Sequence, residues 1–560
     1  MDDLYGHLTY LYGTERSPQL QGRVQSMLDR YRARIPRREY ALSEQDVILI
    51  AYGDQVFAPH EKPLQTLNAF CMTHLAGLVS GIHILPFFPS SSDDGFSVVD
   101  YRSVDPALGD WQEIALLGEG FRLMFDAVIN HASSRSAWFQ GFLHGEPRYR
   151  DFFIPVNDAQ DLSQVVRPRT SPLLTSFAAP SGETRVWTTF SADQVDLNYM
   201  NPEVLLEILD VLLGYVEHGA SFLRLDAIAY VWKEPGTPCI HLPQTHRVIQ
   251  FLRAALNQIA PQVRLVTETN VAHAENISYF GDGTNEAQLV YNFALPPLIL
   301  HSLQTSDAGI LSKWASTLSP PSENTAFFNF LASHDGIGLN AARGILSEAE
   351  IHRLVESTLD HGGMVSCKQN VDGSQSPYEL NINYFDALSD PGRNEPQDLQ
   401  VDRFIVAQAV MLSLAGLPGI YFHSLFGSRG WPAGVKQTGH YRAINREKPP
   451  LERLQAELAQ AGSLRSQVFK RFRQLLLGRR DSPAFHPHGR QRILDLHPAV
   501  FALERISPGG QNRAFCLHNL SPRRIPVSLA DRAHTDLFTG EPLPGTRITL
   551  NPYQVLWAKS

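Results

Sequence analysis

The sequence predicts an α/β fold: a (β/α)8 TIM barrel with inserted subdomains after strands 3 and 7 and a C-terminal all-β domain. Eight short apolar segments alternate with helical patterns through most of the chain, as the strands and helices of a barrel do. Two of the intervening connections are much longer than the others. Near residue 480 the helical patterns give way to strands and turns.

The eight predicted strands are largely apolar on both faces, which is typical of parallel strands covered by helices. They occupy residues 46–53, 81–88, 121–131, 221–230, 263–270, 289–295, 326–335 and 417–423. The helical segment 202–219 illustrates the connectors. It starts after Asn201, a residue suited to cap a helix, and ends on Gly219.

The long connections follow the third and seventh strands. The first contains RPR (167–169) and a strand-like segment at 184–190, and the second contains a Gly-, Ser- and Asn-rich stretch at 361–380. Insertions at the C-terminal rim of a barrel commonly shape the substrate site, and a tolerated surface excursion is the alternative.

We expect five units from this pattern. An arginine-rich helical extension (1–45) would pack on the barrel or form an interface. The barrel would comprise 46–131, 199–336 and 403–478, with an inserted B subdomain at 132–198, a second inserted subdomain at 337–402 and the β domain at 479–560. The strands expected in that last domain are 499–506, 512–520, 546–550 and 553–558.

Composition narrows the functional classes. The 560 residues carry a net charge of −9, so no nucleic-acid surface is expected. The four cysteines lie far apart, which favours free thiols over a disulfide or zinc site. The N-terminus does not resemble a signal peptide, and no apolar run approaches the roughly 20 residues of a membrane span. We expect a soluble cytoplasmic protein without membrane contact.

Polar side chains cluster at the C-terminal ends of four predicted strands, where barrels carry their active sites. They are Asp126, Asn130 and His131, then Arg224 and Asp226, then Glu268, and finally His334 and Asp335. Two carboxylates roughly 5 Å apart are the equipment of a retaining glycosidase-type mechanism, with one as nucleophile and the other as acid/base. A purely structural role for acids at three rims is the less favoured interpretation.

The two carboxylates need opposite protonation states. Arg224 and Asp226 leave the same face of one strand, and we expect the guanidinium to lower the pKa of Asp226 and hold it ionised. Glu268 follows the apolar residues LVT, a setting that raises a carboxyl pKa and suits an acid/base. Asp335 would stabilise positive charge on a sugar ring.

The motifs DAVINH, FLRLDA, VTETN and FLASHD, in this order, resemble the four signature regions of the α-amylase superfamily, glycoside hydrolase family 13. The resemblance implies that Asp226 is the nucleophile, Glu268 the acid/base and Asp335 the transition-state stabiliser. It also implies that His131 and His334 bind glucosyl hydroxyls and that Arg224 orients the nucleophile.

Further segments resemble the sucrose phosphorylase subfamily: HILPFFPSSSDDGFSVVDY (83–101), RPR (167–169) and YRAINR (441–446). By this resemblance, Asp93 and Arg442 clamp the far end of a glucosyl unit, and Arg169 and Tyr378 handle phosphate. Aromatic side chains near the strand ends would form an apolar wall for the sugar or serve as plain packing. They are Phe96, Phe88 and Tyr230.

Three departures from the sucrose phosphorylase pattern concern the acceptor side. Asn270 stands where that pattern has His, Glu379 stands where it has Gln, and the 361–380 loop carries Lys368. The whole chain most closely resembles glucosylglycerate phosphorylases, in SPYELNINY (376–384) and WKEPGT (232–237) for example. The implied reaction converts 2-O-α-D-glucosyl-D-glycerate and phosphate into α-D-glucose 1-phosphate and D-glycerate.

An anionic acceptor requires a cation or backbone donors for its carboxylate. The cations available in rim loops are Arg167, Arg169, Lys233 and Lys368. A phosphorylated acceptor would need the same groups, so these cations do not distinguish glycerate from a phosphorylated acceptor. For Lys368 the alternative is a solvated lysine in a loop without a binding role.

We therefore predict a glycosyltransferase-type phosphorylase whose small-molecule partners are a glucoside, phosphate and glycerate, without cofactor or metal, as a monomer or homodimer. The alternatives are a sucrose, sucrose 6-phosphate or glucosylglycerol phosphorylase, or a related hydrolase or transglucosidase. A noncatalytic sugar-binding barrel is a further alternative, but Asp226, Glu268 and Asp335 are all present, which argues against it.

Overall fold

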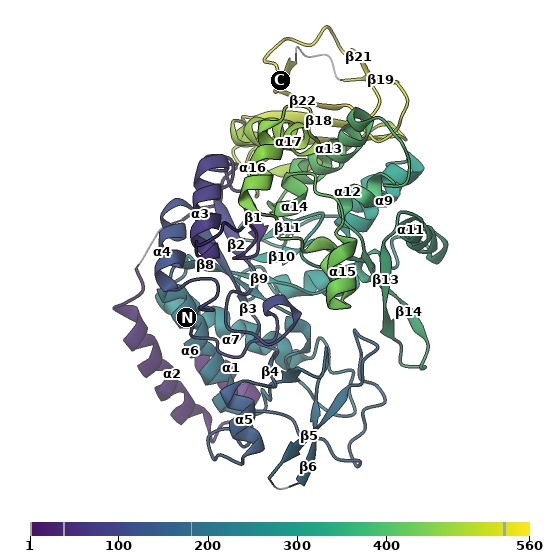
Figure 1. The fold of residues 1–560 in the computed structure, drawn as a ribbon. Coiled ribbons are helices and arrows are strands. Elements are labelled where there is room, and N and C mark those ends of the chain that lie inside the picture. The colour runs from purple at the N-terminus through teal and green to yellow at the C-terminus, as the bar shows by residue number, and fades with distance from the viewer. Residues whose placement is uncertain (1–2, 37–39, 181, 530–533, 560) are drawn as a thin grey trace.

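The computed structural model describes residues 3–36, 40–180, 182–529 and 534–559. Eight parallel strands close into a barrel, which confirms the predicted fold class (Figure 1). In order around the barrel they are β1 (Ile48–Ala51), β2 (Gly81–Ile84), β3 (Arg122–Ala127), β8 (Ala220–Leu225), β9 (Arg264–Thr267), β10 (Leu289–Tyr291), β11 (Ala326–Asn329) and β15 (Leu417–Tyr421).

Each barrel strand lies within a predicted segment or overlaps it closely, but most strands end earlier than predicted. At the C-terminal rim, the polar residues at the ends of the predicted segments lie beyond the hydrogen-bonded part of the strands. β8, for example, ends at Leu225, and Ala227 beyond it adopts a left-handed conformation with φ 49°. Asp226 and Glu268 therefore stand just past the ends of β8 and β9, whereas Arg224 lies inside β8.

Helices cover the outside of the barrel (Figure 1). The principal ones are α3 (Pro63–His74), α4 (Trp111–Gly120), α6 (Pro202–Glu217), α7 (Pro243–Ile259), α9 (Leu295–Thr305), α13 (Gln397–Ser413) and α17 (Leu464–Arg480). Asn201 caps α6 as predicted, because its side chain accepts a hydrogen bond from the Glu203 backbone nitrogen. Shorter helices are α8 (His273–Asn276), α10 (Gly309–Ala315), α12 (Tyr384–Leu388), α14 (Phe422–Leu425), α15 (Pro432–Thr438) and α16 (Leu451–Ala459).

Both long connections carry small sheets of their own. The first contains β4 (His131–Ser133), α5 (Ala137–Leu143), β5 (Leu174–Ala179), β6 (Gly182–Trp187) and β7 (Gln194–Asp196), in which β4 pairs with β7 and β5 with β6. The second contains β12 (Ile337–Gly338), α11 (Glu348–Asp360), β13 (Met364–Gln369) and β14 (Gln375–Asn381). A backbone bridge between Arg167 and Gln369 joins the two insertions.

The N-terminal helices α1 (Leu4–Tyr12) and α2 (Ser17–Arg32) pack on α6 and α7. Ion pairs line this contact, with Arg23 on Glu203 at 2.5 Å and Arg34 on Glu217 at 2.9 Å. Arg23 and Arg34 thus serve packing against the barrel in this structure.

The C-terminal region is all-β, as predicted. One sheet has the order β16 (Arg490–His497), β17 (Val500–Ile506), β18 (Arg513–Asn519), β22 (Val555–Lys559) and β20 (Thr535–Asp536), and a second pairs β19 (Ile525–Ser528) with β21 (Arg547–Leu550). The sequence analysis missed β16 because its residues, RQRILDLH, are half-exposed and rich in charge. None of the helices in the described part of the chain is long and apolar enough to cross a membrane.

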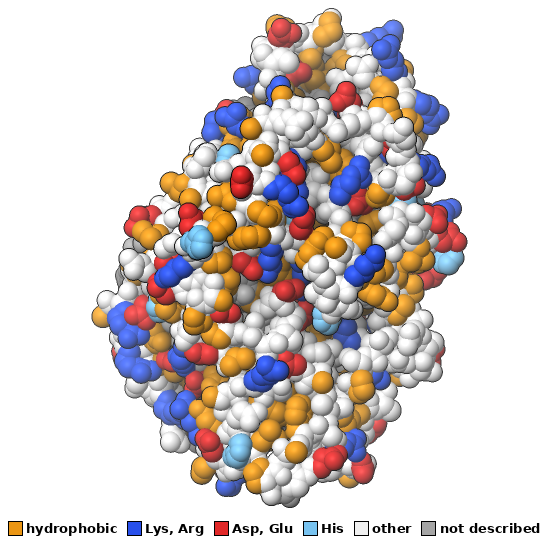
Figure 2. Space-filling model, viewed as in Figure 1, with side chains coloured by type: hydrophobic (Ala, Val, Ile, Leu, Met, Phe, Trp, Pro, Cys, Tyr) orange, Lys and Arg blue, Asp and Glu red, His pale blue; other side chains and the backbone are white. Residues whose placement is uncertain are grey.

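Figure 2 shows Lys and Arg side chains interspersed with Asp and Glu over the visible face of the molecule. This mixture agrees with the charge balance of the sequence. On that face the charged groups of one sign do not gather into the broad basic surface that nucleic-acid binding uses.

Candidate active site

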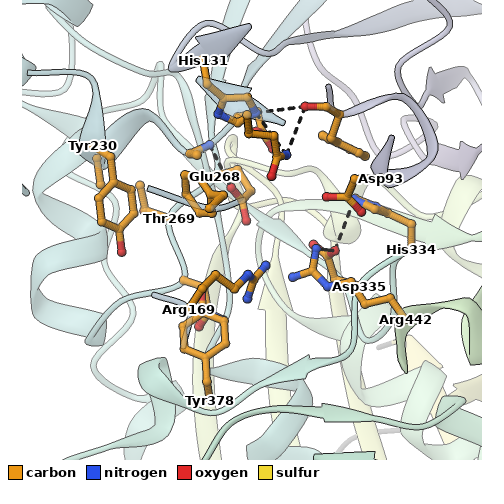
Figure 3. Close-up of a pocket in the computed structure, with 17 residues that line it drawn as sticks. Asp93, His131, Arg169, Tyr230, Glu268, Thr269, His334, Asp335, Tyr378 and Arg442 are labelled. Carbon is orange, nitrogen blue, oxygen red and sulfur yellow. Dashed lines mark hydrogen bonds and ion pairs between the residues drawn. The ribbon is translucent and has the colours of Figure 1, made fainter. Parts of the chain in front are cut away.

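A pocket opens at the C-terminal ends of the barrel strands, where the sequence placed the functional groups (Figure 3). Most of the predicted site residues line it. They are Asp93, Phe96, His131, Arg169, Asp226, Tyr230, Glu268, Asn270, His334, Asp335, Tyr378 and Arg442. Three predicted residues, Arg224, Glu379 and Lys368, are not among the lining residues.

Arg224 lies directly beneath two carboxylates of the pocket. Its Nη1 donates to Asp226 Oδ1 at 3.0 Å, and its Nη2 lies 3.9 Å from Glu268 Oε1. A single guanidinium that contacts both carboxylates keeps them close together. The backbone nitrogen of left-handed Ala227 donates to Glu268 Oε2 at 3.1 Å, so the end of β8 positions the second carboxylate as well.

Arg224 acts to lower the pKa of Asp226, as expected, but other effects outweigh it. Burial raises the pKa of Asp226 to about 7, and the nearby carboxylates of Asp126 and Asp335 add to this effect against the opposing Arg224. The guanidinium is shared, because Arg224 also donates to the buried Asp126, its register partner on β3. One cation between several carboxylates does not compensate for their loss of water.

The expectation for Glu268 agrees with the structure. Burial raises the pKa of Glu268 to about 7, and Asp226 and Asp335 raise it further. Near neutral pH the buried pair therefore tends to hold one proton. Because Asp226 has the shorter contact with Arg224, we assign the charge to Asp226 and the proton to Glu268.

Asp335 is the ionised carboxylate of the pocket. Burial acts to raise its pKa, but the guanidiniums of Arg442 and Arg446 beside it hold that pKa below its ordinary value. Arg442 Nη1 lies 2.5 Å from Asp335 Oδ1, an ion pair drawn as a dashed line in Figure 3. Arg442 also donates to the buried Glu379 at 3.0 and 2.7 Å.

Asp93 does not contact Arg442, its predicted companion, but Arg446. Arg446 Nη1 lies 3.2 Å from Asp93 Oδ1 and 2.7 Å from Asp94 Oδ2, and its Nε donates to the His334 carbonyl at 2.9 Å. Asp93 is left-handed, with φ 51°, and these contacts help to hold it there. The sequence analysis missed Arg446, although it quoted the motif that contains it.

The two predicted hydroxyl-binding histidines lie beside one aromatic ring. His334 stacks on Phe96 with ring centroids 4.6 Å apart, and burial lowers its pKa well below the ordinary value, so it is neutral. His131 Nε2 lies 2.9 Å from the Phe96 carbonyl oxygen. Phe96 and Tyr230 line the pocket, whereas Phe88 lies outside it and stacks on Tyr215.

Arg169 and Tyr378 approach the pocket from the two insertions. The Arg169 guanidinium lies 5.3 Å from the centroid of the Tyr378 ring and 5.9 Å from that of Phe190. In Figure 3 this guanidinium points into the pocket, toward the region between Glu268 and Asp335. The insertions thus bring a cation and a phenol to the open side of the catalytic carboxylates.

Other rim cations lie elsewhere. Lys233 is buried, with Nζ 2.5 Å from Asp196 Oδ2 and 2.6 Å from Asn130 Oδ1, so it is not available to an acceptor. Arg167 donates to the Ser171 carbonyl. Lys368 lies on β13, half-buried, where burial lowers its pKa.

Several lining residues were not predicted: Phe190, Gln194, Ala227, Ala229 and Thr269. Gln194 and Phe190 come from the first insertion, whose path over the barrel has no strand-end signal in the sequence. Thr269 could have been found, since it stands between Glu268 and Asn270. Within the described ranges, no group of three or more His, Cys, Asp or Glu side chains is arranged to hold a metal ion.

Comparison with known proteins agrees with this geometry. The model of the α-amylase catalytic domain matches residues 74–337. A glucosylglycerate phosphorylase from Allomeiothermus silvanus is 50% identical over 551 residues, covering 98% of this chain and 97% of that protein. Another from Escherichia coli is 45% identical over 560 residues, covering 100% and 99%. The chain belongs to the glucosylglycerate phosphorylase family.

Among solved structures, sucrose 6F-phosphate phosphorylase from Thermoanaerobacter thermosaccharolyticum aligns with a TM-score of 0.76 at 25% identity, over 91% of this chain and 99% of that one. The resemblance read from the signature motifs is thereby confirmed, and so is the barrel with its C-terminal β region.

Proposed function

We propose that this chain is a retaining glucoside phosphorylase that converts 2-O-α-D-glucosyl-D-glycerate and phosphate into α-D-glucose 1-phosphate and D-glycerate. One observation carries the proposal beyond glycoside cleavage. A guanidinium without a carboxylate partner among the described residues, that of Arg169, faces the reacting carboxylates. The printed names of the relatives that match over the whole chain support the acceptor.

In the first half-reaction, Asp226 attacks the anomeric carbon and forms a β-glucosyl ester. The bond to the glycerate oxygen breaks as the Glu268 proton passes to that oxygen. Asp335, kept ionised by Arg442, faces the positive charge that develops on the ring. His131, His334 and Asp93 line the glucosyl end and are suited to bind hydroxyls.

In the second half-reaction, a phosphate oxygen bonds to the anomeric carbon and the ester to Asp226 breaks. Two inversions restore the α configuration. Hydrogen phosphate is already anionic and needs no deprotonation before attack, and the hydrogen left on the new phosphate ester returns to Glu268. Arg169 and Tyr378 lie on the open side, from which phosphate enters.

The test is phosphate release from α-D-glucose 1-phosphate with one acceptor at a time. The panel is D-glycerate, glycerol, fructose, fructose 6-phosphate and water alone. We expect release with D-glycerate far above the rest. Release chiefly with a fructose compound would replace the acceptor and keep the mechanism, whereas release with none would contradict the proposal.

A further inference from the structure

Two residues with a permanent positive charge line the pocket in the described part of the chain, Arg169 and Arg442. Arg442 is neutralised by two carboxylates, Asp335 at 2.5 Å and Glu379 at 2.7 Å. Glu379 is buried and holds the guanidinium with two parallel hydrogen bonds. A small anion that enters the pocket would have to displace one of these carboxylates to pair with Arg442.

Arg169 is in the opposite situation. No hydrogen bond or ion pair joins its guanidinium to another described residue, and its close neighbours are the rings of Tyr378 and Phe190. Aromatic faces position a guanidinium without cancelling its charge. The loop that carries Arg169 is fixed to β13 by the backbone bridge between Arg167 and Gln369. The charge is therefore held in place and left available.

The negatively charged groups that line the pocket repel anions. Four carboxylates line it, those of Asp93, Asp226, Glu268 and Asp335. The proposed reaction nevertheless brings in two anionic groups by turns: the glycerate carboxylate in one half-reaction and phosphate in the other. A buried anion without a pairing cation is strongly disfavoured, and the guanidinium fork suits both carboxylate and phosphate.

We infer that Arg169 is the common anion-binding residue of both half-reactions, so that it pairs with the carboxylate of glycerate as well as with phosphate. This inference rests on the proposed function and deepens it. It makes Arg169 the residue that selects an anionic acceptor over a neutral one, and the two anions exclude each other from one position. The departing glycerate vacates the cation that phosphate then takes.

The test uses α-D-glucosyl fluoride as donor. Fluoride is a small leaving group, and its departure does not require Arg169 to pair with a carboxylate. Transfer to D-glycerate, to phosphate and to glycerol is measured for the wild type, Arg169→Ala and Arg169→Lys. Arg167→Ala is the matched control, since it removes a guanidinium from the same loop that does not line the pocket.

We expect Arg169→Ala to lose about 10- to 100-fold in transfer to both glycerate and phosphate relative to its transfer to glycerol. Arg169→Lys should recover part of both losses, and Arg167→Ala should change the three acceptors equally. In the wild type, phosphate should compete with glycerate.

Two results separate the inference from the function beneath it. If Arg169→Ala loses transfer to phosphate alone, the common anion-binding role of Arg169 is wrong, but the proposed phosphorylase function is unaffected. If the wild-type enzyme transfers glucose to neither glycerate nor phosphate, the proposed function itself fails. The melting temperature of Arg169→Ala, compared with that of Arg167→Ala, shows whether the variant has folded.

Discussion

Glu379 holds Arg442 with two hydrogen bonds, at 3.0 and 2.7 Å, from the strand that also carries Tyr378. The same guanidinium reaches Asp335 at 2.5 Å. Arg442 thereby links the second insertion to a carboxylate of the catalytic pocket. The glucosyl end and the open end of the pocket depend on one buried ion-pair chain.

Glu379→Gln should loosen this link. The variant keeps the shape of the side chain but removes its charge, so Arg442 loses the charge of its two-bond partner. We expect kcat/KM for the glucosyl donor to fall about tenfold, mainly through KM. Glu348→Gln is the matched control, because Glu348 pairs with Arg343 on the exposed surface of the same insertion. Equal kinetics for Glu379→Gln and the wild type would remove Arg442 positioning from the account.

Glu268→Gln should discriminate between leaving groups. The variant cannot donate a proton, so phosphorolysis of glucosylglycerate should fall by at least about 10²-fold. Release of fluoride from α-D-glucosyl fluoride should fall far less, since fluoride leaves without full protonation. Steady-state rates with both donors measure the difference. Equal losses for the two donors would take the acid role from Glu268.

The pH profile should be bell-shaped around neutrality. The pKa values of Asp226 and Glu268 are both raised to about 7, and activity needs one proton between them. At low pH both carboxyls are neutral and no nucleophile remains, and at high pH both are ionised and no acid remains. Phosphorolysis of glucosylglycerate at saturating phosphate, followed against pH, measures the profile, because this leaving group needs the Glu268 proton. In Glu268→Gln the alkaline limb should disappear, and its persistence would contradict the assignment.

The same pKa shifts predict a change in stability. A carboxyl whose folded-state pKa lies above its unfolded value stabilises the fold at low pH, and this contribution is lost as pH rises through the folded pKa. Asp226→Asn carries no such charge. Its melting temperature should therefore exceed that of the wild type increasingly between about pH 4 and pH 7. A difference that does not change with pH would contradict the raised pKa.

Lys233→Met should destabilise the fold without touching the pocket. The change leaves the buried Asp196 carboxylate without its ammonium partner, which costs about 3–5 kcal/mol of unfolding free energy. Lys448→Met is the control, because the partly exposed pair of Lys448 with Asp54 contributes only about 0–1 kcal/mol. Chemical denaturation of both variants measures the contrast, and equal midpoints would show that the buried pair is not a structural brace.

The sequence predicts the barrel, and the meeting of three carboxylates in one pocket, because both depend on local pattern. Asp226 and Glu268 come directly behind apolar strands and Asp335 follows a third after a short loop, and parallel strands bring their ends together. The pKa of Asp226 could not be predicted in the same way. The sign of its shift depends first on how completely the fold buries the carboxyl, and then on Asp126, a neighbour across the sheet that shares Arg224.

The pairing of the rim cations also depends on distant contacts. Lys233 has the same local sequence signal as an acceptor-binding residue, but β7 of the first insertion places Asp196 against it. In YRAINR, two arginines stand on one short 3-10 helix and its end, and only the fold decides that Arg446 and not Arg442 meets Asp93. No local pattern carries such information.

The central claim is that glucose passes through an ester on Asp226, and the most direct measurement is the mass of the trapped intermediate. Glu268→Gln is incubated with α-D-glucosyl fluoride without an acceptor, quenched in acid and digested. We predict one added glucosyl unit on the peptide that contains Asp226, its disappearance on addition of phosphate, and no adduct in the double variant that also carries Asp226→Asn. A glucosyl adduct on the peptide containing Asp335, or turnover of Asp226→Asn at the wild-type rate, would contradict the account.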